Sequence, residues 1–486
     1  MPITKVSTSD FDKVRDAVAD LKLMFAARSN ELGRPLTYNI HTYGCQLNES
    51  DSEKISGYLE DMGLEESEGT ADINIFNTCS IRENADDRLF GNLGVLKADK
   101  RKNKDMIIAV CGCMMKVQKN IDKIINSYPY VDLIFDPQQL HLMPLLLKES
   151  LSKRKMAVRI DDIDYIADDN YMPVARKRKF RALVPIMYGC NNFCTYCIVP
   201  YTRGRERSRD FDEIIKQLND LASQGYKEVM LLGQNVNSYG KDLGEHRGFA
   251  DLLEAAAQIK GFSRIRFMTS HPKDITDDVL HIMAKYDTIE RHLHLPLQSG
   301  SDAVLKRMNR HYTREKYLRT AKLYRELIPE GTLSTDIIVG FPGETEEDFK
   351  DTLSLVEEMR FDSAFTFQYS RRPGTPADKF EDQIPQDVVT DRFGRLLDLQ
   401  NRLVYESNQS TVGKTFEVLI EGESSTAPDI LSGRTKCSRL VNFTIPEELG
   451  ITYGSANDLE GRLCIVKITN ARPYSIEGVM VELLNE

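Results

Sequence analysis

The sequence predicts an α/β protein of several domains: an N-terminal parallel α/β sheet domain, a partial (β/α)6 barrel and a small C-terminal antiparallel β-barrel. Three observations support this fold class. The length of 486 residues exceeds what one hydrophobic core usually supports. Short apolar runs alternate with helical stretches over 36–150 and again over 181–376. From 412 onward, short strands are separated by turn residues.

The first two segments are a helical extension and a sheet domain. Residues 1–35 carry apolar side chains at helical spacing, among them Phe11, Val14 and Leu21. In 36–150, candidate strands lie at 37–43, 72–77, 106–111 and 131–135, and candidate helices lie at 49–62, 82–99, 117–126 and 138–150. This alternation predicts a parallel sheet covered on both faces, which binds ligands beyond the carboxyl ends of its strands.

Residues 151–180 form a linker with split charge, basic at both ends and acidic between them. The next domain, 181–411, has candidate strands at 182–188, 228–232, 264–268, 291–295, 333–338 and 364–369. Its candidate helices lie at 211–224, 249–259, 275–285, 313–327, 345–358 and 387–411. Six β/α units are too few for a closed eight-unit barrel, so we expect a partial one. Residues 412–486 form the last domain.

Composition limits the class of protein. Hydrophobic residues make up 41% and charged residues 28%, as in ordinary globular chains. No apolar run approaches the roughly 20 residues of a membrane helix, and the N-terminal segment lacks the features of a secretion signal, so we expect a cytoplasmic protein without a membrane partner. In a reducing compartment, the nine cysteines are expected to be metal ligands, reactive groups or buried thiols. A net charge of −10 argues against a uniformly basic surface.

Cys190, Cys194 and Cys197 are separated by three and then two residues. A short loop with this spacing can wrap three thiolates around one face of a four-iron cluster, which leaves one iron open to a further ligand. The loop follows the first barrel strand, at the end where such folds carry active sites. The alternatives are a zinc site, for which a fourth ligand is missing nearby, and a chance group of buried thiols.

Cys45, Cys79 and Cys113 each stand just past the carboxyl end of a predicted strand of the first sheet. Because such strands lie about 4.8 Å apart, the three thiols can converge on one crevice. Cys111 competes with Cys113 as the third member, but Cys111 lies within the apolar run of its strand. Three unrelated buried thiols are the alternative.

The cysteine spacing, with Tyr196 before the last cysteine, resembles the radical S-adenosylmethionine (SAM) superfamily. Cys45-Gln-Leu-Asn-Glu-Ser-Asp-Ser, Asn77-Thr-Cys79, Gly112-Cys113-Met114 and Cys194-Thr-Tyr-Cys-Ile-Val-Pro-Tyr-Thr-Arg-Gly204 together resemble the methylthiotransferases that act on bacterial tRNA. The resemblance implies a [4Fe–4S] cluster on Cys190, Cys194 and Cys197 that binds SAM, and an auxiliary [4Fe–4S] cluster on Cys45, Cys79 and Cys113. It also implies a product, the 2-methylthio derivative of N6-isopentenyladenosine beside the anticodon of tRNA.

Polar groups at other strand ends are candidates for SAM contacts. Gly233 allows close backbone approach, and Gln234 and Asn235 offer neutral donors and acceptors. In the family that the chain resembles, these regions line the SAM pocket, and Tyr196, Ser270, Gln298 and Asp336 belong to the same set. For Ser270 and Asp336, capping of the following helix is an equally good interpretation.

Arg203, Arg205, Arg207 and Arg209 alternate after the cysteine loop. If this stretch is extended, all four side chains point to one side and suit phosphate contacts; a solvated charged surface is the alternative. The C-terminal domain resembles a TRAM domain, an RNA-binding module. The resemblance further implies tRNA as a partner, a reduced flavodoxin- or ferredoxin-type electron donor, and proteins that deliver iron–sulfur clusters and sulfur.

Three other functions remain open at this point. The same chemistry could act on an aspartate of a ribosomal protein or on threonylcarbamoyl-adenosine in tRNA. The chain could also be a non-enzymatic metal-containing RNA-binding protein. The metal and sulfide content separates the last function from the enzymatic ones.

Overall fold

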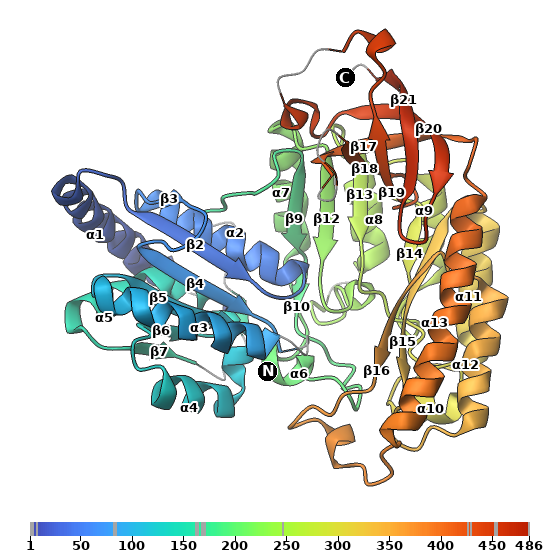
Figure 1. Ribbon diagram of the computed structural model, residues 1–486, viewed down its shortest axis with the longest axis horizontal. Coiled ribbons are helices and arrows are strands. Elements are labelled where there is room, and N and C mark those ends of the chain that lie inside the picture. Colours follow the sequence, from blue (N-terminus) through green and yellow to red (C-terminus); the bar gives the residue numbers. More distant parts are fainter. Residues whose placement is uncertain are drawn as a thin grey trace.

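A computed structural model describes residues 4–5, 8–80, 85–160, 165–166, 172–244, 247–424, 427, 430–451 and 455–484. Most of the acidic part of the expected linker lies outside these residues. The chain forms three units: an N-terminal α/β sheet, a barrel of parallel strands and a C-terminal β-barrel (Figure 1). This is the predicted fold class, and it is confirmed.

The N-terminal sheet has six parallel strands in the order β3-β2-β4-β5-β6-β7. Its strands are β2 (Thr37–Thr42), β3 (Glu65–Glu66), β4 (Ile73–Thr78), β5 (Ile107–Gly112), β6 (Leu133–Phe135) and β7 (Ala157–Arg159). Its helices are α1 (Thr8–Leu32), α2 (Gln46–Asp61), α3 (Ala85–Lys102), α4 (Gln118–Ser127) and α5 (Met143–Lys153). The sequence analysis missed the short strands β3 and β7, and the two-residue parallel pair of β1 (Thr4–Lys5) with β8 (Tyr165–Ile166).

Two separate apolar cores cover the two faces of this sheet. One contains residues of α1, α2 and α5, and the other contains residues of α3 and α4. The N-terminal extension is therefore part of the first core, where Val14, Leu21 and Phe25 of α1 are buried. A parallel sheet needs cover on both faces, which explains why every residue of its central strands β4 and β5 is buried.

The second unit has six parallel strands in two sets, β9-β12-β13 and β14-β15-β16, linked by a bridge between Ile265 and Ile289. The strands are β9 (Arg181–Pro185), β12 (Glu228–Leu232), β13 (Arg264–Phe267), β14 (His292–His294), β15 (Thr332–Val339) and β16 (Ser363–Gln368). The helices are α6 (Val199–Thr202), α7 (Phe211–Ser223), α8 (Phe249–Ala257), α9 (Asp277–Lys285), α10 (Asp302–Arg307), α11 (Arg314–Leu327), α12 (Glu346–Met359) and α13 (Gln386–Gln409).

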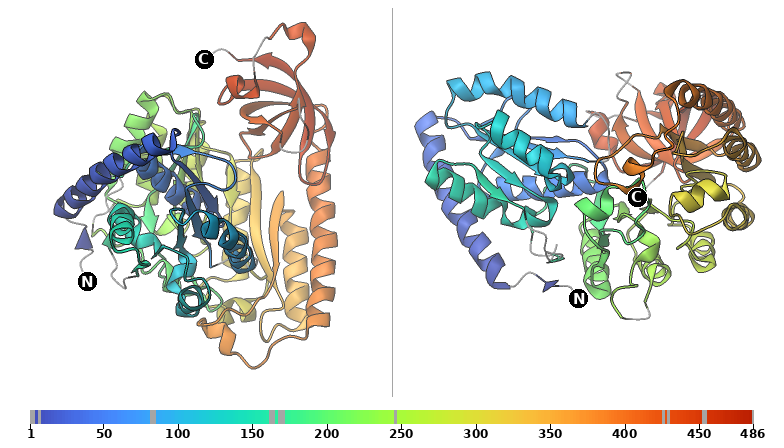
Figure 2. Two further views of the ribbon diagram at one scale, coloured as in Figure 1. Left: turned by 60° about the vertical axis from the view of Figure 1, so that its left-hand side comes forward. Right: turned by 90° about the horizontal axis from the view of Figure 1, so that it is seen from below.

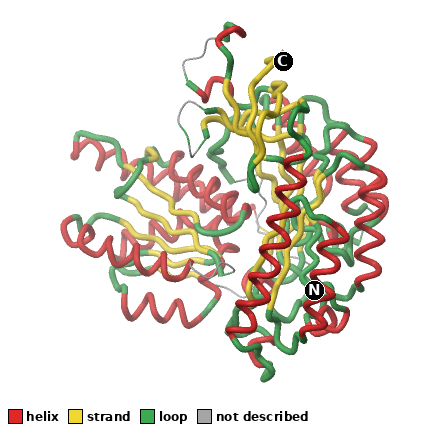
Figure 3. Tube along the Cα trace, turned by 45° about the vertical axis from the view of Figure 1, so that its right-hand side comes forward, coloured by secondary structure: helices red, strands yellow, loops and turns green. Residues whose placement is uncertain are grey.

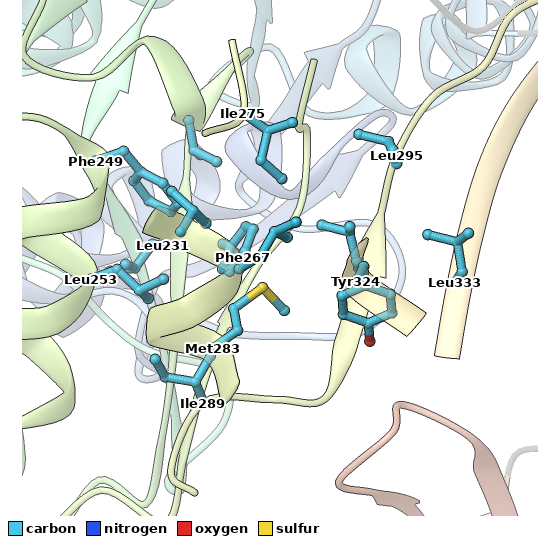
Figure 4. Packing of buried hydrophobic residues seen from close by; sticks show 14 of the residues in the cluster. Leu231, Phe249, Leu253, Phe267, Ile275, Met283, Ile289, Leu295, Tyr324 and Leu333 are labelled. Carbon is cyan, nitrogen blue, oxygen red and sulfur yellow. The ribbon is translucent and has the colours of Figure 1, made fainter. Parts of the chain in front are cut away.

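The helices of this barrel lie outside its strands (Figure 3). Strand residues such as Leu231 and Phe267 pack against Phe249 and Leu253 of α8 and Met283 of α9 (Figure 4). Fully buried apolar side chains of this size each contribute about 1.5–3 kcal/mol. This core holds the strand ends, and therefore the loops that follow them, in fixed positions.

The third unit is a closed barrel of five strands: β17 (Thr415–Glu423), β18 (Leu431–Thr435), β19 (Leu440–Thr444), β20 (Leu463–Ala471) and β21 (Ile476–Leu483). All neighbouring pairs are antiparallel except β19 and β21, which pair in parallel. It packs against the amino ends of the larger barrel's strands (Figure 2). There, Arg264 Nη1 donates to the Arg434 carbonyl oxygen at 2.9 Å, and Thr332 Oγ1 donates to the Cys437 carbonyl oxygen at 2.5 Å.

Helix α2 joins the N-terminal sheet to the large barrel, where it contacts β9 (Figure 1). Its polar side chains are buried and bonded across the contact. Glu53 lies 3.6 Å from Arg176, and Lys54 Nζ donates to the Tyr188 hydroxyl oxygen at 3.2 Å. The carboxyl edges of the two parallel sheets are thereby fixed beside each other.

Candidate active site and metal centres

The loop with Cys190, Cys194 and Cys197 lies between β10 (Met187–Tyr188) and β11 (Arg207–Ser208), which pair antiparallel at the carboxyl end of β9. It leaves β10 through Gly189 at φ 74°, where an added Cβ would lie 1.9 Å from the Arg205 carbonyl oxygen. The Cys197 amide donates to the Cys194 carbonyl oxygen at 2.9 Å. Only glycine fits the first position, so the path of the loop is fixed from its start.

Of the three cysteines of this loop, Cys194 is buried and Cys190 and Cys197 are half-buried. Burial raises the pKa of Cys190 and of Cys197 to about 12, and the neighbouring charge of Cys194 adds to both shifts. Arg310 Nη1 lies 3.4 Å from Cys194 Sγ, as a hydrogen-bond donor. A metal centre binds the thiolate form, and it would supply the charge that deprotonates such thiols. The loop therefore fits a shared metal centre beside a buried arginine.

Cys45, Cys79 and Cys113 follow the neighbouring strands β2, β4 and β5. An added Cβ at Gly44 would lie only 2.9 Å from Cys79 Cβ, so the loops after β2 and β4 are in close contact. Burial raises the pKa of Cys113 to about 12; the charge of Arg203 opposes this rise, and those of Cys45 and Cys79 add to it. The three thiols therefore lie at one edge of the sheet and fit a second centre.

Cys111 lies differently from Cys113. It belongs to the apolar core of β5, together with Ile75 and Phe135, and burial raises its pKa well above the usual range. In the part of the chain that the structure describes, no group of three His, Cys, Asp or Glu side chains is placed to hold a single metal ion. The thiolates of a four-iron cluster bind different irons and stand further apart.

One cavity of about 290 Å³ connects the two sets of cysteines. Cys45 and Cys113 line it from the N-terminal sheet, and Cys190, Cys194 and Cys197 line it from the barrel loop. Cys79 is buried behind this surface. A molecule bound in the cavity would therefore meet both sets.

Six of the seven residues predicted to contact SAM line the same cavity: Tyr196, Gly233, Gln234, Ser270, Gln298 and Asp336. The Gln234 Oε1 and Ser270 Oγ atoms are buried and have no hydrogen-bond partner among the described residues. Asn235 is placed differently, because its side-chain amide donates to the Asp274 carboxylate at 2.8 Å outside the lining. The cavity therefore offers unpaired polar atoms to a ligand.

The predicted row of four arginines is not formed. The chain after the loop is not extended throughout, because α6 ends at Thr202, Arg203 caps it and Gly204 turns at φ 77°. Arg207 is buried and donates to carbonyl oxygens of its own segment, and Arg209 donates to the Pro185 carbonyl oxygen at 2.7 Å. The buried members of the row therefore do not form one exposed surface, and contact of Arg207 and Arg209 with RNA stays a prediction.

The other two arginines differ from each other. Arg205 is exposed, and its guanidinium carbon lies 4.4 Å from the centre of the Phe193 ring. Arg203 is buried and points into the N-terminal domain. RNA contact therefore stays a prediction for Arg205, while Arg203 belongs to the cavity.

Two further residues of this site, Arg310 and Asp51, were not predicted from the sequence. Arg310 lies in the loop after α10, where no periodic pattern marks it, and it lines the cavity beside Cys194. Asp51 is a buried residue of α2 that binds Arg203 at 2.9 Å. Asp51 stands within the motif that begins at Cys45, so the motif contained a signal for it.

The fold and the cavity define a radical SAM enzyme. The profile of the radical SAM superfamily matches residues 184–356, that of the uncharacterized protein family UPF0004 matches 37–136, and that of the TRAM domain matches 409–481. A solved radical S-adenosylmethionine methyltransferase, TsrM from Kitasatospora setae, shares the fold with a TM-score of 0.51 at 11% identity, over 77% of this chain and 90% of that one.

The chain belongs to the family of the tRNA-2-methylthio-N(6)-dimethylallyladenosine synthases. The synthase of Clostridium perfringens (strain 13) is 52% identical over 91% of this chain and 97% of the relative. That of Acetivibrio thermocellus is 45% identical over 98% of this chain and 97% of the relative.

Proposed function

We propose that the protein attaches a methylthio group to C2 of N6-isopentenyladenosine beside the anticodon of tRNA. The names of the relatives support this activity. In the chain itself, the observation that carries the proposal is the cavity that Cys45 and Cys113 share with Cys190, Cys194 and Cys197. Activation of a carbon atom and delivery of sulfur to it require both centres at one substrate atom.

Two [4Fe–4S] clusters would be held here, one by Cys190, Cys194 and Cys197 and one by Cys45, Cys79 and Cys113. When bound, the clusters and SAM supply a radical that removes hydrogen from the adenine carbon and a methylated sulfur that takes its place. The residues of the chain bind, orient and exclude water.

Other cavity residues fit the polar groups of SAM. Gly233 lines the cavity, and glycine is needed there because an added Cβ would lie 2.7 Å from Met187 Cγ. Gln234 Oε1 and Ser270 Oγ are free to bind the amino acid end of SAM. Asp336, whose carboxylate lies 3.5 Å from His294 Nε2, is an acceptor for hydroxyl groups.

The proposal includes partners and a compartment. The C-terminal barrel, with its match to the TRAM domain, supports tRNA as the substrate. A reduced flavodoxin- or ferredoxin-type protein would supply electrons, and other proteins would supply iron–sulfur clusters and sulfur. None of the helices in the described ranges has the length and apolar character needed to cross a membrane. We place the enzyme in the cytoplasm, and we propose domain boundaries at 181–411 and 412–486 for the two barrels. The N-terminal unit extends beyond the predicted 36–150, because α1 packs in its core and β7 belongs to its sheet, so residues 1–35 and the first part of 151–180 are not separate from it.

The two-cluster arrangement is tested by metal analysis under anaerobic conditions. The reconstituted chain should hold about eight irons with equivalent sulfide. Cys194→Ala and Cys113→Ala should each reduce this to about four, and Cys194→Ala should abolish SAM cleavage. Cys111→Ala is the matched control and should keep the full iron content. About one zinc without sulfide would contradict the proposal.

The substrate is tested by nucleoside mass spectrometry. The reconstituted protein, with SAM and a reductant, should convert isopentenylated tRNA to its 2-methylthio form. Modification of threonylcarbamoyl-adenosine instead, or of a ribosomal-protein aspartate with unchanged tRNA, would assign the chain to one of the other methylthiotransferase activities.

A further inference from the structure

Arg203 connects the two cysteine sets. It follows α6, six residues after Cys197, and its side chain crosses to the N-terminal domain. There its Nε donates to Cys113 Sγ at 2.8 Å and its Nη1 donates to Asp51 Oδ2 at 2.9 Å. The Arg203 side chain is only 5% exposed and that of Asp51 7%. Arg203 thus stands in the segment that carries Cys190, Cys194 and Cys197, and its guanidinium binds Cys113 of the other cysteine set.

The guanidinium keeps donors that the protein does not use. Arginine has five N–H donors, and Nη2 of Arg203 is buried without a hydrogen-bond partner among the described residues. The same side chain lines the cavity. Unpaired N–H groups of a buried cation, next to a cysteine sulfur, offer hydrogen bonds to an electron-rich sulfur group in that space.

The neighbouring arginines do not share this placement. Arg207 and Arg209 donate to carbonyl oxygens of the barrel domain, and Arg205 is exposed. Arg203 differs from them in that its side chain bonds to Cys113 and Asp51 of the N-terminal domain. Its partner Asp51 lies on α2, the helix that contacts β9 of the barrel, so the contact belongs to the domain interface.

We propose that Arg203 is a positioning residue for methylthio transfer: it fixes Cys113 and α2 against the radical SAM loop and directs its remaining N–H groups at the sulfur side of the auxiliary centre. This inference rests on the proposed function. Reduction adds negative charge to an iron–sulfur cluster, so a charged donor on its sulfur ligand favours the reduced state. Loss of the guanidinium should therefore make the auxiliary cluster harder to reduce and loosen the domain contact.

The first test isolates the auxiliary cluster in the full-length chain. With Cys190, Cys194 and Cys197 replaced by alanine, electron paramagnetic resonance at a fixed applied potential gives the ratio of reduced to oxidised cluster. Arg203→Gln should lower this ratio by about tenfold or more, and Arg203→Lys should restore part of it because it keeps the charge. Arg205→Gln, which removes the same charge two residues away, should leave it unchanged. Equal ratios for Arg203→Gln and Arg205→Gln would overturn the inference.

The second test needs no cluster. Hydrogen–deuterium exchange of the metal-free chain, with its cysteines intact, should show faster exchange of amides in 46–52 and 113–116 for Arg203→Gln than for Arg205→Gln. Unchanged exchange at both segments would contradict the positioning role.

If the cysteine-replaced chain binds no iron, the two-cluster proposal is wrong, and hydrogen–deuterium exchange still shows whether Arg203 stabilises the domain contact. If it binds about four irons and Arg203→Gln changes nothing, only the inference about Arg203 fails.

Discussion

Gly112 places Cys113 through its backbone conformation. It ends β5 at φ 98° and ψ −177°, a combination that is essentially restricted to glycine. An added Cβ would lie 2.2 Å from the Thr78 carbonyl oxygen, in the strand that leads to Cys79. The close contact of the loops after β4 and β5 therefore depends on the absence of a side chain at this position.

Gly112→Ala should destabilise the N-terminal domain by about 1–3 kcal/mol and displace Cys113 from the auxiliary site. We expect the iron content to fall from about eight to about four per chain, with SAM cleavage retained by the other cluster. Anaerobic iron analysis and urea unfolding measure the two effects.

Gly94→Ala is the control for this substitution. Gly94 lies in α3 without a positive φ, and an added Cβ meets nothing within 4 Å. We expect a gain of about 0.4–1 kcal/mol in stability and full iron content. Full iron content in Gly112→Ala as well would refute the role given to this glycine.

Single residues differed in how well the sequence predicted them. The second cysteine set could be expected at one edge, because Cys45, Cys79 and Cys113 follow strands of a parallel sheet and such strands end together. The arginines could not be placed in this way, since the side on which Arg203 points depends on the one-turn helix α6. Arg310 could not be found, because its contact with Cys194 joins distant parts of the chain.

At the level of elements, α2 is the least ordinary helix. The residues from Leu47 to Leu59, except Glu49, are buried, although many of them are polar. Asn48 donates to the Asn77 side chain at 3.0 Å, Asp51 binds Arg203, and Glu53 lies 3.6 Å from Arg176. A buried polar residue is tolerated when it is paired, so this helix depends on the domains on both sides of it.

Glu53 should make the stability depend on pH. Burial raises its pKa from 4.5 to about 7, against the opposing charge of Arg176. The folded chain therefore binds more protons than the unfolded one between these values, and stability falls as the pH rises from about 4.5 to about 7. Glu53→Gln has no carboxyl group to titrate at this position and lacks this loss of stability. The unfolding free energy of Glu53→Gln minus that of the unsubstituted chain should therefore be larger at pH 8 than at pH 5, by up to about 3 kcal/mol.

Urea unfolding of the metal-free proteins at pH 5 and pH 8 measures this difference. Glu65→Gln, at an exposed position of β3, is the control and should behave like the unsubstituted chain at both pH values. A constant difference between Glu53→Gln and the unsubstituted chain would show that Glu53 keeps its charge throughout.

The sequence predicted the elements to different degrees. The long strands and helices of both α/β units have clear periodic patterns and occur where they were expected. Two-residue strands such as β3 and β11 carry no pattern that a sequence could show. The parallel pairing of β19 with β21 closes the small barrel, and closure depends on tertiary geometry rather than local sequence.

On the scale of the whole molecule, the C-terminal barrel lies at the amino ends of the large barrel's strands, whereas the cysteines lie at the carboxyl ends. A second cavity, of about 450 Å³, is lined by residues of both barrels and of α13. Gln46 and Met268 line this cavity and also the cavity with the cysteines, so the two adjoin. An RNA strand held by the C-terminal barrel can therefore reach the cysteines along the side of the large barrel.

Phe365 lines the second cavity, next to Asp336 and His294 of the first. It belongs to β16, where it pairs in register with Asp336, its ring centre lies 6.0 Å from that of His294, and it is 52% exposed. An exposed aromatic ring on this path can stack on an unpaired base, an interaction worth about 1–3 kcal/mol.

Phe365→Ala should therefore raise the Kd for an isopentenylated anticodon stem–loop by about 5- to 150-fold, as measured by fluorescence anisotropy. Its unfolding free energy should change by less than about 0.5 kcal/mol, because the ring is half exposed. Tyr405→Ala removes a ring of similar exposure, 45%, from α13 outside both cavities and should leave RNA binding unchanged. If both variants bind the RNA like the unsubstituted chain, the path along β16 is not the one the RNA takes.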